Sequence, residues 1–115
     1  MSLFRKNKKS KLPDPTRTVQ VVATLTDSDG NPLSGKSVNL YYRPSGSTTW
    51  NDIGTNPHTT DTNGQVTDTI DLSVPGDYDF RAEFPGDADY EPSSDELHNQ
   101  RIKAKTTITI TITPQ

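Results

Sequence analysis

The chain contains no cysteine. No disulfide can therefore join its strands, and no thiolate can ligate a metal or act as a nucleophile. No stretch approaches the roughly 18 apolar residues of a membrane span. The N-terminus also lacks the apolar region of a secretory signal. We therefore expect a fold held by packing, without membrane insertion, that is made and first folded in the cytoplasm if Met1 is the native start.

Hydrophobic residues are scarce, at 28% of the chain, but they are ordered in the sequence. Within residues 76–84, one parity is apolar and the other is charged: Tyr78, Phe80, Ala82 and Phe84 against Asp77, Asp79, Arg81 and Glu83. This period of two is typical of a strand with one buried face. The low apolar fraction, arranged at alternate positions, therefore indicates a small hydrophobic core rather than disorder.

The 115 residues fit one domain of about 100 residues with a short extension. We assign residues 1–16 to a basic N-terminal arm and Pro-rich linker, and residues 17–115 to the domain. Pro13 and Pro15 favour an extended path between them. The arm holds five of the twelve basic residues, whereas the chain from Leu12 onward has seven basic and fifteen acidic residues. A basic arm thus precedes an acidic body.

Period-two segments predict an all-β fold without helix, with about seven to nine antiparallel strands in two sheets. The predicted strands are residues 18–26, 37–43, 48–53, 65–72, 76–84 and 102–113. Residues 85–99 are predicted to be a long loop. Asp68 falls on the inward parity of its strand, so we expect a bulge or a rim position there.

Three segments together resemble the bacterial immunoglobulin-like (Big) domains, which occur in surface proteins and adhesins and on phage particles. The segments are VVATLTDSDGNPLSGKSVNLYY (residues 21–42), TTDTNGQVTDTIDL (59–72) and PGDYDFRAEFPGDADYEPSS (75–94). The resemblance covers residues 18–113. It implies an immunoglobulin-like antiparallel β-sandwich and a role in display or adhesion, and it brings no catalytic residues.

Three aromatic residues are assigned structural roles. Tyr78 follows Pro75-Gly76-Asp77 with the spacing of a tyrosine corner, in which the phenol bonds to backbone upstream. Phe80 stands where the second cysteine of an antibody domain would be. Tyr90 is interpreted as an anchor for the long loop over residues 85–99, with contact to a partner as the alternative.

We expect no metal site and no cofactor. Residues 27–31 begin like a calcium loop, but Val38 stands where a bidentate Glu is required, and Asp87 and Asp89 resemble ordinary turn residues. His58 and His98 are far apart in the sequence and lack cysteine partners, so zinc is not expected. The chain also lacks a nucleophile elbow, a phosphate loop and a cofactor fingerprint, so we expect no enzyme.

Tyr41, Tyr42 and Trp50 form a possible ligand face. Aromatic side chains on neighbouring strands can stack on a sugar ring, but cross-strand packing on a half-buried sheet explains them as well. Binding of glycans or of a host surface through the sandwich therefore stays open.

The arm has three interpretations: a solvated tail, a nucleic-acid binder or an attachment arm. Nucleic acid is not the expected partner, because the arm is short, has one aromatic residue and precedes an acidic domain. We favour attachment to an acidic protein surface of a capsid or other assembly protein. The residues assigned to this contact are Leu3, Phe4, Arg5, Lys6, Lys8, Lys9 and Lys11.

Together these observations predict a non-enzymatic structural or display protein attached to a larger assembly. The leading hypothesis is a virion accessory or capsid decoration protein, located on the virion surface. The first alternative is a repeat module of a bacterial or archaeal adhesin or S-layer-type protein at the extracellular cell surface. The second alternative is a carbohydrate-binding module.

Overall fold

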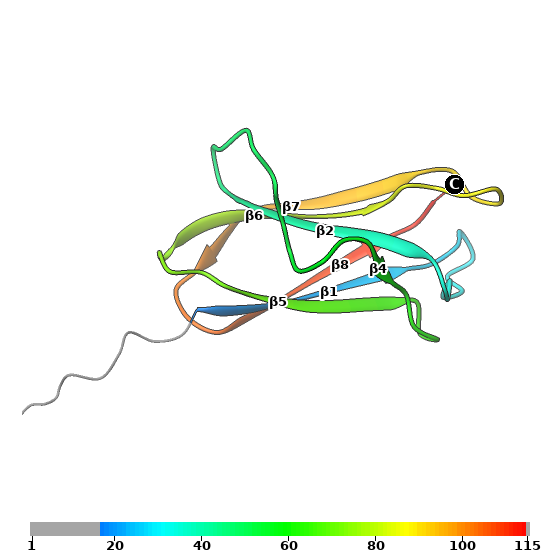
Figure 1. The fold of residues 1–115 in the computed structure, drawn as a ribbon, viewed down its shortest axis with the longest axis horizontal. Helices are drawn as coiled ribbons and strands as arrows, with labels where there is room; N and C mark the ends of the chain where they lie inside the picture. Colours follow the sequence, from blue (N-terminus) through cyan, green and yellow to red (C-terminus); the bar gives the residue numbers. More distant parts are fainter. Residues whose placement is uncertain (1–16, 115) are drawn as a thin grey trace, which may run out of the picture.

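The computed structural model describes residues 17–114, which form eight strands in two sheets and no helix (Figure 1). The strands are β1 (Thr18–Leu25), β2 (Ser37–Pro44), β3 (Asn51–Asp52), β4 (His58–Thr59), β5 (Gln65–Asp71), β6 (Gly76–Phe84), β7 (Ser93–Ile102) and β8 (Thr106–Ile112). The predicted all-β class, with strands in two sheets and no helix, is confirmed for these residues. Nothing helical in residues 17–114 is long and apolar enough to cross a membrane. The predicted attachment arm lies outside the described residues.

The smaller sheet has the strand order β5-β1-β8. β1 pairs antiparallel with β5, and Val21 lies opposite Asp68. On its other side β1 pairs with β8 in parallel, and Val21 lies opposite Ile108. The prediction of antiparallel strands throughout is therefore wrong for this pair. Residues 103–105 carry the chain from β7 in one sheet to β8 in the other, and β8 then runs in the direction of β1.

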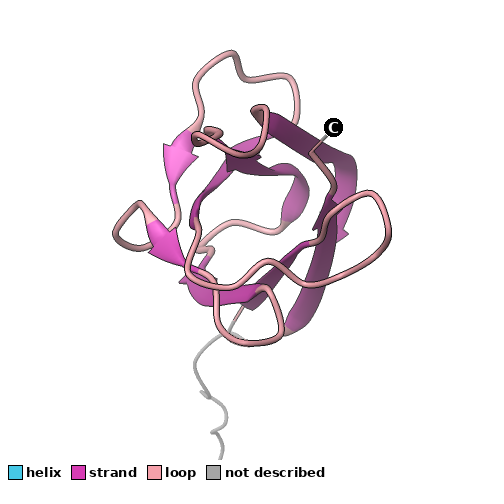
Figure 2. Cartoon of the chain, turned by 90° about the vertical axis from the view of Figure 1, so that its right-hand side faces the viewer, coloured by secondary structure: helices cyan, strands magenta, loops and turns pink. Residues whose placement is uncertain are grey.

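The larger sheet has the order β3-β2-β6-β7, and β4 also pairs with β2. β2 lies antiparallel to β6, with Tyr41 opposite Arg81. The predicted extra strand over residues 48–53 is present in a shorter form as β3, and Trp50 directly precedes it. Seen along the strands, the two sheets enclose the interior from both sides (Figure 2).

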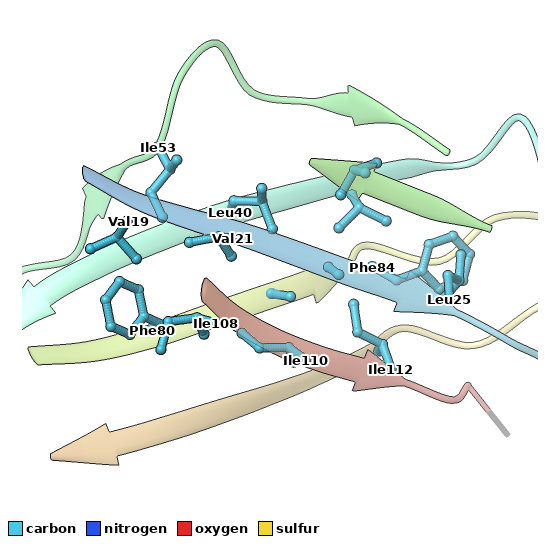
Figure 3. Close-up of a cluster of buried hydrophobic side chains, with 14 of the residues drawn as sticks. Val19, Val21, Leu25, Leu40, Ile53, Phe80, Phe84, Ile108, Ile110 and Ile112 are labelled. Carbon is cyan, nitrogen blue, oxygen red and sulfur yellow. The ribbon is translucent and has the colours of Figure 1, made fainter. Parts of the chain in front are cut away.

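The core is built by the inward parity of strands from both sheets (Figure 3). Its fully buried side chains include Val19, Val21, Leu25, Leu40, Ile53, Phe80, Phe84, Ile110 and Ile112. Burying one side chain of this size contributes about 1.5–3 kcal/mol. Without a disulfide, this layer holds the sheets together, and its position agrees with the predicted alternation in β1, β2 and β6.

Two predicted boundaries in the last third of the chain are wrong. β7 occupies much of the predicted loop over residues 85–99, and the predicted single strand over residues 102–113 is broken at residues 103–105. β7 was missed because its sequence, SSDELHNQRI, is mostly polar. Only Leu97 and Ile102 among its side chains pack on the core, so an edge strand bonded to β6 shows little hydrophobic alternation.

Of the two alternatives predicted for Asp68, a bulge or a rim position, the bulge is absent. β5 pairs with β1 in an uninterrupted register through Asp68, so the strand has no bulge there. Instead, the carboxylate lies 2.9 Å from Nε2 of His58, which belongs to β4 of the other sheet. An inward carboxylate is tolerated because it has an ion-pair or hydrogen-bond partner.

Candidate functional site

The outward side of the larger sheet carries a connected set of charged and aromatic side chains, which we call the polar face. Its members are Tyr41, Arg43, Trp50, Asp79, Arg81, Glu83, Glu96 and His98. Strand alternation explains the set, because the β2 and β6 members have the parity opposite to the core residues Leu40 and Phe80. These side chains therefore share the outward side of the larger sheet.

Asp79 is the centre of the polar face, with only 3% of its surface exposed. One carboxylate oxygen accepts hydrogen bonds from Ser45 Oγ at 2.7 Å and from the Asn99 backbone N–H at 2.9 Å. The other accepts one from Arg43 Nε at 2.9 Å. A buried carboxylate is costly unless it is paired and hydrogen-bonded, and here both oxygens are used.

A β-bulge brings the Asn99 donor to Asp79. The β6–β7 register passes from Tyr78 opposite Gln100 to Phe80 opposite Leu97, so two residues of β7 face Asp79. Asn99 takes a φ of 58°, a left-handed conformation that Asn adopts more readily than most residues. The bulge thus turns a backbone N–H toward the buried carboxylate.

These contacts decide the protonation of Asp79. Burial acts to raise its pKa, but the hydrogen bonds from Asn99, Ser45 and Arg43 outweigh burial and lower the pKa to about 2. Nδ1 of His98 also lies 3.4 Å from the carboxylate. Asp79 is therefore a permanent anion at neutral pH and serves to orient its neighbours.

Arg43 and Trp50 are stacked on the polar face. The Arg43 guanidinium carbon lies 4.0 Å from the centroid of the Trp50 ring, which is a cation–π contact. Because Nε of Arg43 also bonds Asp79, the guanidinium is held from two directions. One face of Trp50 is thereby covered, so the predicted aromatic platform does not present that face to a sugar.

Tyr41 lies two residues from Arg43 on the same side of β2, and its hydroxyl donates to Glu83 at 3.3 Å. Burial, and then the charges of Glu83 and Asp52, raise the pKa of Tyr41. Arg81 forms ion pairs with Glu83 and Glu96, and Nε2 of His98 lies 2.8 Å from Glu96. The structure thus brings Tyr41 into a charged network rather than into an aromatic pair with Trp50.

The hydroxyl of Tyr78 donates a 2.6 Å hydrogen bond to the Val74 carbonyl, four residues upstream. This is the hydrogen bond that the sequence predicts for a tyrosine corner. Phe80 is completely buried in the core. Tyr90 is half-buried against the core, and Nζ of Lys36 lies 5.4 Å from its ring centroid. These positions are compatible with the structural roles assigned from the sequence.

The two Asp-rich loops use their carboxylates as turn caps. Asp27 accepts hydrogen bonds from the backbone N–H groups of Asp29 and Asn31. The bond from Asn31 is the largest cause of the lowered pKa of Asp27. Asp87 accepts hydrogen bonds from Nζ of Lys36 at 2.6 Å and from the backbone N–H groups of Asp89 and Tyr90. The bond from Lys36 is the largest cause of the lowered pKa of Asp87. These oxygens are already engaged by the fold.

The two histidines belong to separate networks, since His98 lies on the polar face and His58 bridges β4 and β5. The hydrogen bond from His58, followed by that from the Thr69 N–H, lowers the pKa of Asp68. Gly54 lies against this pair, because a Cβ there would be 1.9 Å from Oδ2 of Asp68. No group of three or more metal-ligating side chains occurs among residues 17–114.

Sequence reasoning missed the Asp79 network and the His58–Asp68 pair. The sequence places Asp79 on the outward parity with Arg81, so nothing marks it as buried. Its hydrogen bond from a backbone N–H depends on the bulge at Asn99, whose only local signal is that Asn tolerates a positive φ. Asp68 did carry a signal, namely its inward parity, but the partner lies in a two-residue strand without periodicity.

Comparisons with solved structures find likeness of fold. The "Streptococcal ancillary pilin" is 17% identical with a TM-score of 0.51, over 96% of this chain and 35% of that one. A 9R-lipoxygenase from Cyanothece PCC8801 is 18% identical (TM-score 0.46; 89% of this chain, 18% of that one). A 3-chlorocatechol 1,2-dioxygenase from Rhodococcus opacus 1CP is 12% identical (TM-score 0.47; 94% of this chain, 62% of that one).

This chain spans about a third of the length of the pilin and less than two thirds of either enzyme. A search of curated protein sequences finds no match. The profile of the bacterial Ig-like domain (group 1) matches residues 2–95, which is most of the chain and includes the segments that carried the sequence resemblance. The chain therefore belongs to the bacterial Ig-like domain (group 1) family.

Proposed function

We propose that this chain is a non-enzymatic structural module displayed on a larger assembly and attached to it through residues 1–11. The assembly that we favour is a virus particle, on which the chain would be an accessory or decoration protein. The observation that carries the proposal is the separation of charge, with five basic residues before Leu12 and a net charge of −8 after it.

The geometry of the sandwich supports a structural role. The carboxylates of Asp79 and Asp68 are engaged in hydrogen bonds within the fold. Asp79 accepts from Arg43, Ser45 and Asn99, and Asp68 pairs with His58. A general base or nucleophile needs a lone pair directed at a substrate, whereas these oxygens hold loops, bulges and sheets in place. The family of bacterial Ig-like domains fits such a role.

The favoured partner surface is acidic. Lys and Arg side chains of the arm would form screened charge contacts with it, while Leu3 and Phe4 would add apolar contact. The acidic sandwich would be repelled by the same surface, so the domain would project outward from the assembly. This arrangement explains why the basic residues are concentrated in one short segment.

A cell-surface module is the second candidate. The family membership and the fold shared with a protein described as an ancillary pilin favour it. In this candidate the chain would be one unit of a longer surface protein, and the basic segment would connect units. Carbohydrate binding has less support, because Arg43 covers one face of Trp50 and Tyr41 bonds Glu83.

Fractionation of the source organism distinguishes the two candidates. An antibody raised against residues 17–115 would follow the native chain through separation of released particles from cell envelopes on a density gradient. We expect the chain to band with particles that contain nuclease-protected nucleic acid. Recovery only in the envelope fraction, as part of a much longer polypeptide, would contradict the virion proposal and support the cell-surface module.

A further inference from the structure

Three of the free sheet edges carry features that oppose pairing with another strand. β3 and β4, at one edge of the larger sheet, have only two residues each. β7, at the other edge, is interrupted by the bulge at Asn99 and carries charged side chains. β5, at one edge of the smaller sheet, has the inward carboxylate of Asp68. Short strands, bulges and inward charges are the known ways to block edge-to-edge pairing.

The fourth edge, β8, lacks these features. Its sequence is TTITITI, seven residues without charge, proline or glycine, and its register with β1 is regular throughout. Ile108, Ile110 and Ile112 face the core, whereas Thr107, Thr109 and Thr111 are exposed on the outer side. β-branched residues have high strand propensity, so the sequence of β8 is well suited to pairing with a further strand.

The direction of the backbone groups of β8 follows from one hydrogen bond. The Ile112 carbonyl accepts the Thr26 N–H at 3.0 Å and therefore points toward the β1 side. Backbone N–H and C=O groups of successive strand residues point alternately to the two edges. The donor and acceptor of Thr107, Thr109 and Thr111 therefore point to the edge at which β8 has no partner strand among residues 17–114.

The β8 edge is complementary to itself. In an antiparallel pair centred on Thr109, Thr107 of one copy lies opposite Thr111 of the other. The backbone N–H groups of each strand then lie opposite C=O groups of its partner, and Thr side chains pair with Thr side chains on the outer side. The two ends of β8 also differ in charge. Lys103 and Lys105 precede the strand, whereas its far end lies beside the start of β7, where Ser93 Oγ lies 3.3 Å from the Thr113 carbonyl and Asp95 follows.

Antiparallel pairing places the basic end of one copy beside the acidic end of the other. Lys105 of one copy would lie opposite Thr113 of the second, whose carbonyl lies beside Ser93, two residues before the exposed Asp95. A two-fold pair also uses both β8 edges and leaves no further edge of this kind within residues 17–114, so it closes at two copies. We propose that β8 is a homodimerisation strand that joins two copies of this chain through their smaller sheets, centred on Thr109.

A charge exchange at Thr109 tests the proposal. The full chain would be examined by sedimentation velocity and equilibrium over a concentration series, alone and as the variants Thr109→Lys and Thr109→Asp. In the proposed dimer, residue 109 of one copy lies opposite residue 109 of the other. Each single variant therefore places two like charges opposite each other, and we expect its dimer dissociation constant to rise at least about tenfold. An equimolar mixture of the two variants should recover the dimer, because Lys then faces Asp.

Thr67→Lys is the matched control, since Thr67 is exposed on the outer side of the same sheet but on β5. It should leave dimerisation unchanged, and circular dichroism should show that all variants retain the strand spectrum. A wild-type chain that stays monomeric through the series, or a dimer insensitive to Thr109→Lys, would overturn the proposal. Failure of the mixed variants to associate would do so as well, as would growth of the wild type into open-ended polymers. None of these results bears on attachment through residues 1–11.

Discussion

The backbone N–H of Asn99 donates a 2.9 Å hydrogen bond to the buried carboxylate of Asp79. The bond joins the bulge of the edge strand β7 to a group that also fixes Arg43, and through Arg43 the ring of Trp50. One carboxylate thus sets the conformation of an edge strand and the orientation of two outward side chains.

Asp79→Asn should lower the free energy of unfolding at pH 7 by about 2–3 kcal/mol, because an amide group cannot accept hydrogen bonds at both positions and the Arg43 charge loses its partner. Urea denaturation measures the effect. Asp77→Asn is the control: Asp77 contacts Arg101, but both side chains are well exposed, so the change should stay within about 0.5 kcal/mol. Equal effects of the two substitutions would contradict a central role for Asp79.

The stability difference between the wild type and Asp79→Asn should depend on pH. The pKa of Asp79 is lowered from 3.8 to about 2 in the folded chain, so its contribution to stability is present above pH about 4 and is lost as the pH falls through about 2. The stability difference between wild type and Asp79→Asn should therefore shrink in this window. Denaturation midpoints measured from pH 6 to pH 2 test it, and a difference that stays constant would contradict the lowered pKa.

Tyr78→Phe should destabilise the domain by about 1 kcal/mol, since it removes the hydrogen bond to the Val74 carbonyl. Tyr42→Phe is a suitable control, because Tyr42 is also partly buried against the core but its hydroxyl has no hydrogen bond within residues 17–114. Equilibrium denaturation of both variants gives the comparison. A Tyr78→Phe midpoint equal to that of the control would contradict the tyrosine corner.

Gly54→Ala should destabilise more than Gly46→Ala. Both glycines have positive φ, at 65° and 92°, and share the backbone strain of an added Cβ. Only at Gly54 does the Cβ meet Asp68, where it displaces the carboxylate from His58. We expect about 1 kcal/mol for the strain alone and a larger loss at Gly54. Thermal denaturation measures both, and equal losses would show that the His58–Asp68 pair adds no stability.

Millimolar calcium should leave the melting temperature unchanged. Asp27 and Asp87 already accept backbone hydrogen bonds within their own loops, and Asp87 also holds Lys36. A bound cation would have to replace these contacts, and neither loop supplies a full ligand set. A rise of several degrees that Asp27→Ala or Asp87→Ala abolishes would overturn this prediction.

The sequence predicted those parts of the fold in which one strand carries its own signal. Alternation identified the buried residues of β1 and β6, and the spacing before Tyr78 predicted its hydrogen bond to backbone upstream. β7 could not be predicted in this way, because it is stabilised by backbone pairing with β6 rather than by a hydrophobic face of its own. The parallel pairing of β1 and β8 depends on strands more than 80 residues apart in the chain, and no local pattern specifies it.

The same distinction applies to the polar face. The parity of Tyr41 and its proximity to Trp50 in the sequence suggested a ligand platform, but the tertiary partners of each residue decide its role. Glu83 contacts Tyr41, and Arg43 covers Trp50. Asp79 has the most partners on this face, and one of them, the Asn99 N–H, is placed by the bulge in β7. Such a site forms only when three strands are in register.

Attachment through the arm is the central claim, and co-sedimentation of arm variants with the native assembly tests it most directly. A C-terminally tagged chain would be produced in the source organism in three forms: wild type, a deletion of residues 1–11, and a variant with Arg5, Lys6, Lys8, Lys9 and Lys11 replaced by Gln. We expect the wild type to co-sediment with the assembly, the deletion to remain at the top of the gradient while still folded, and the Gln variant to retain only weak binding that does not depend on salt. Full occupancy of the assembly by the deletion variant would contradict the claim and place attachment on the sandwich.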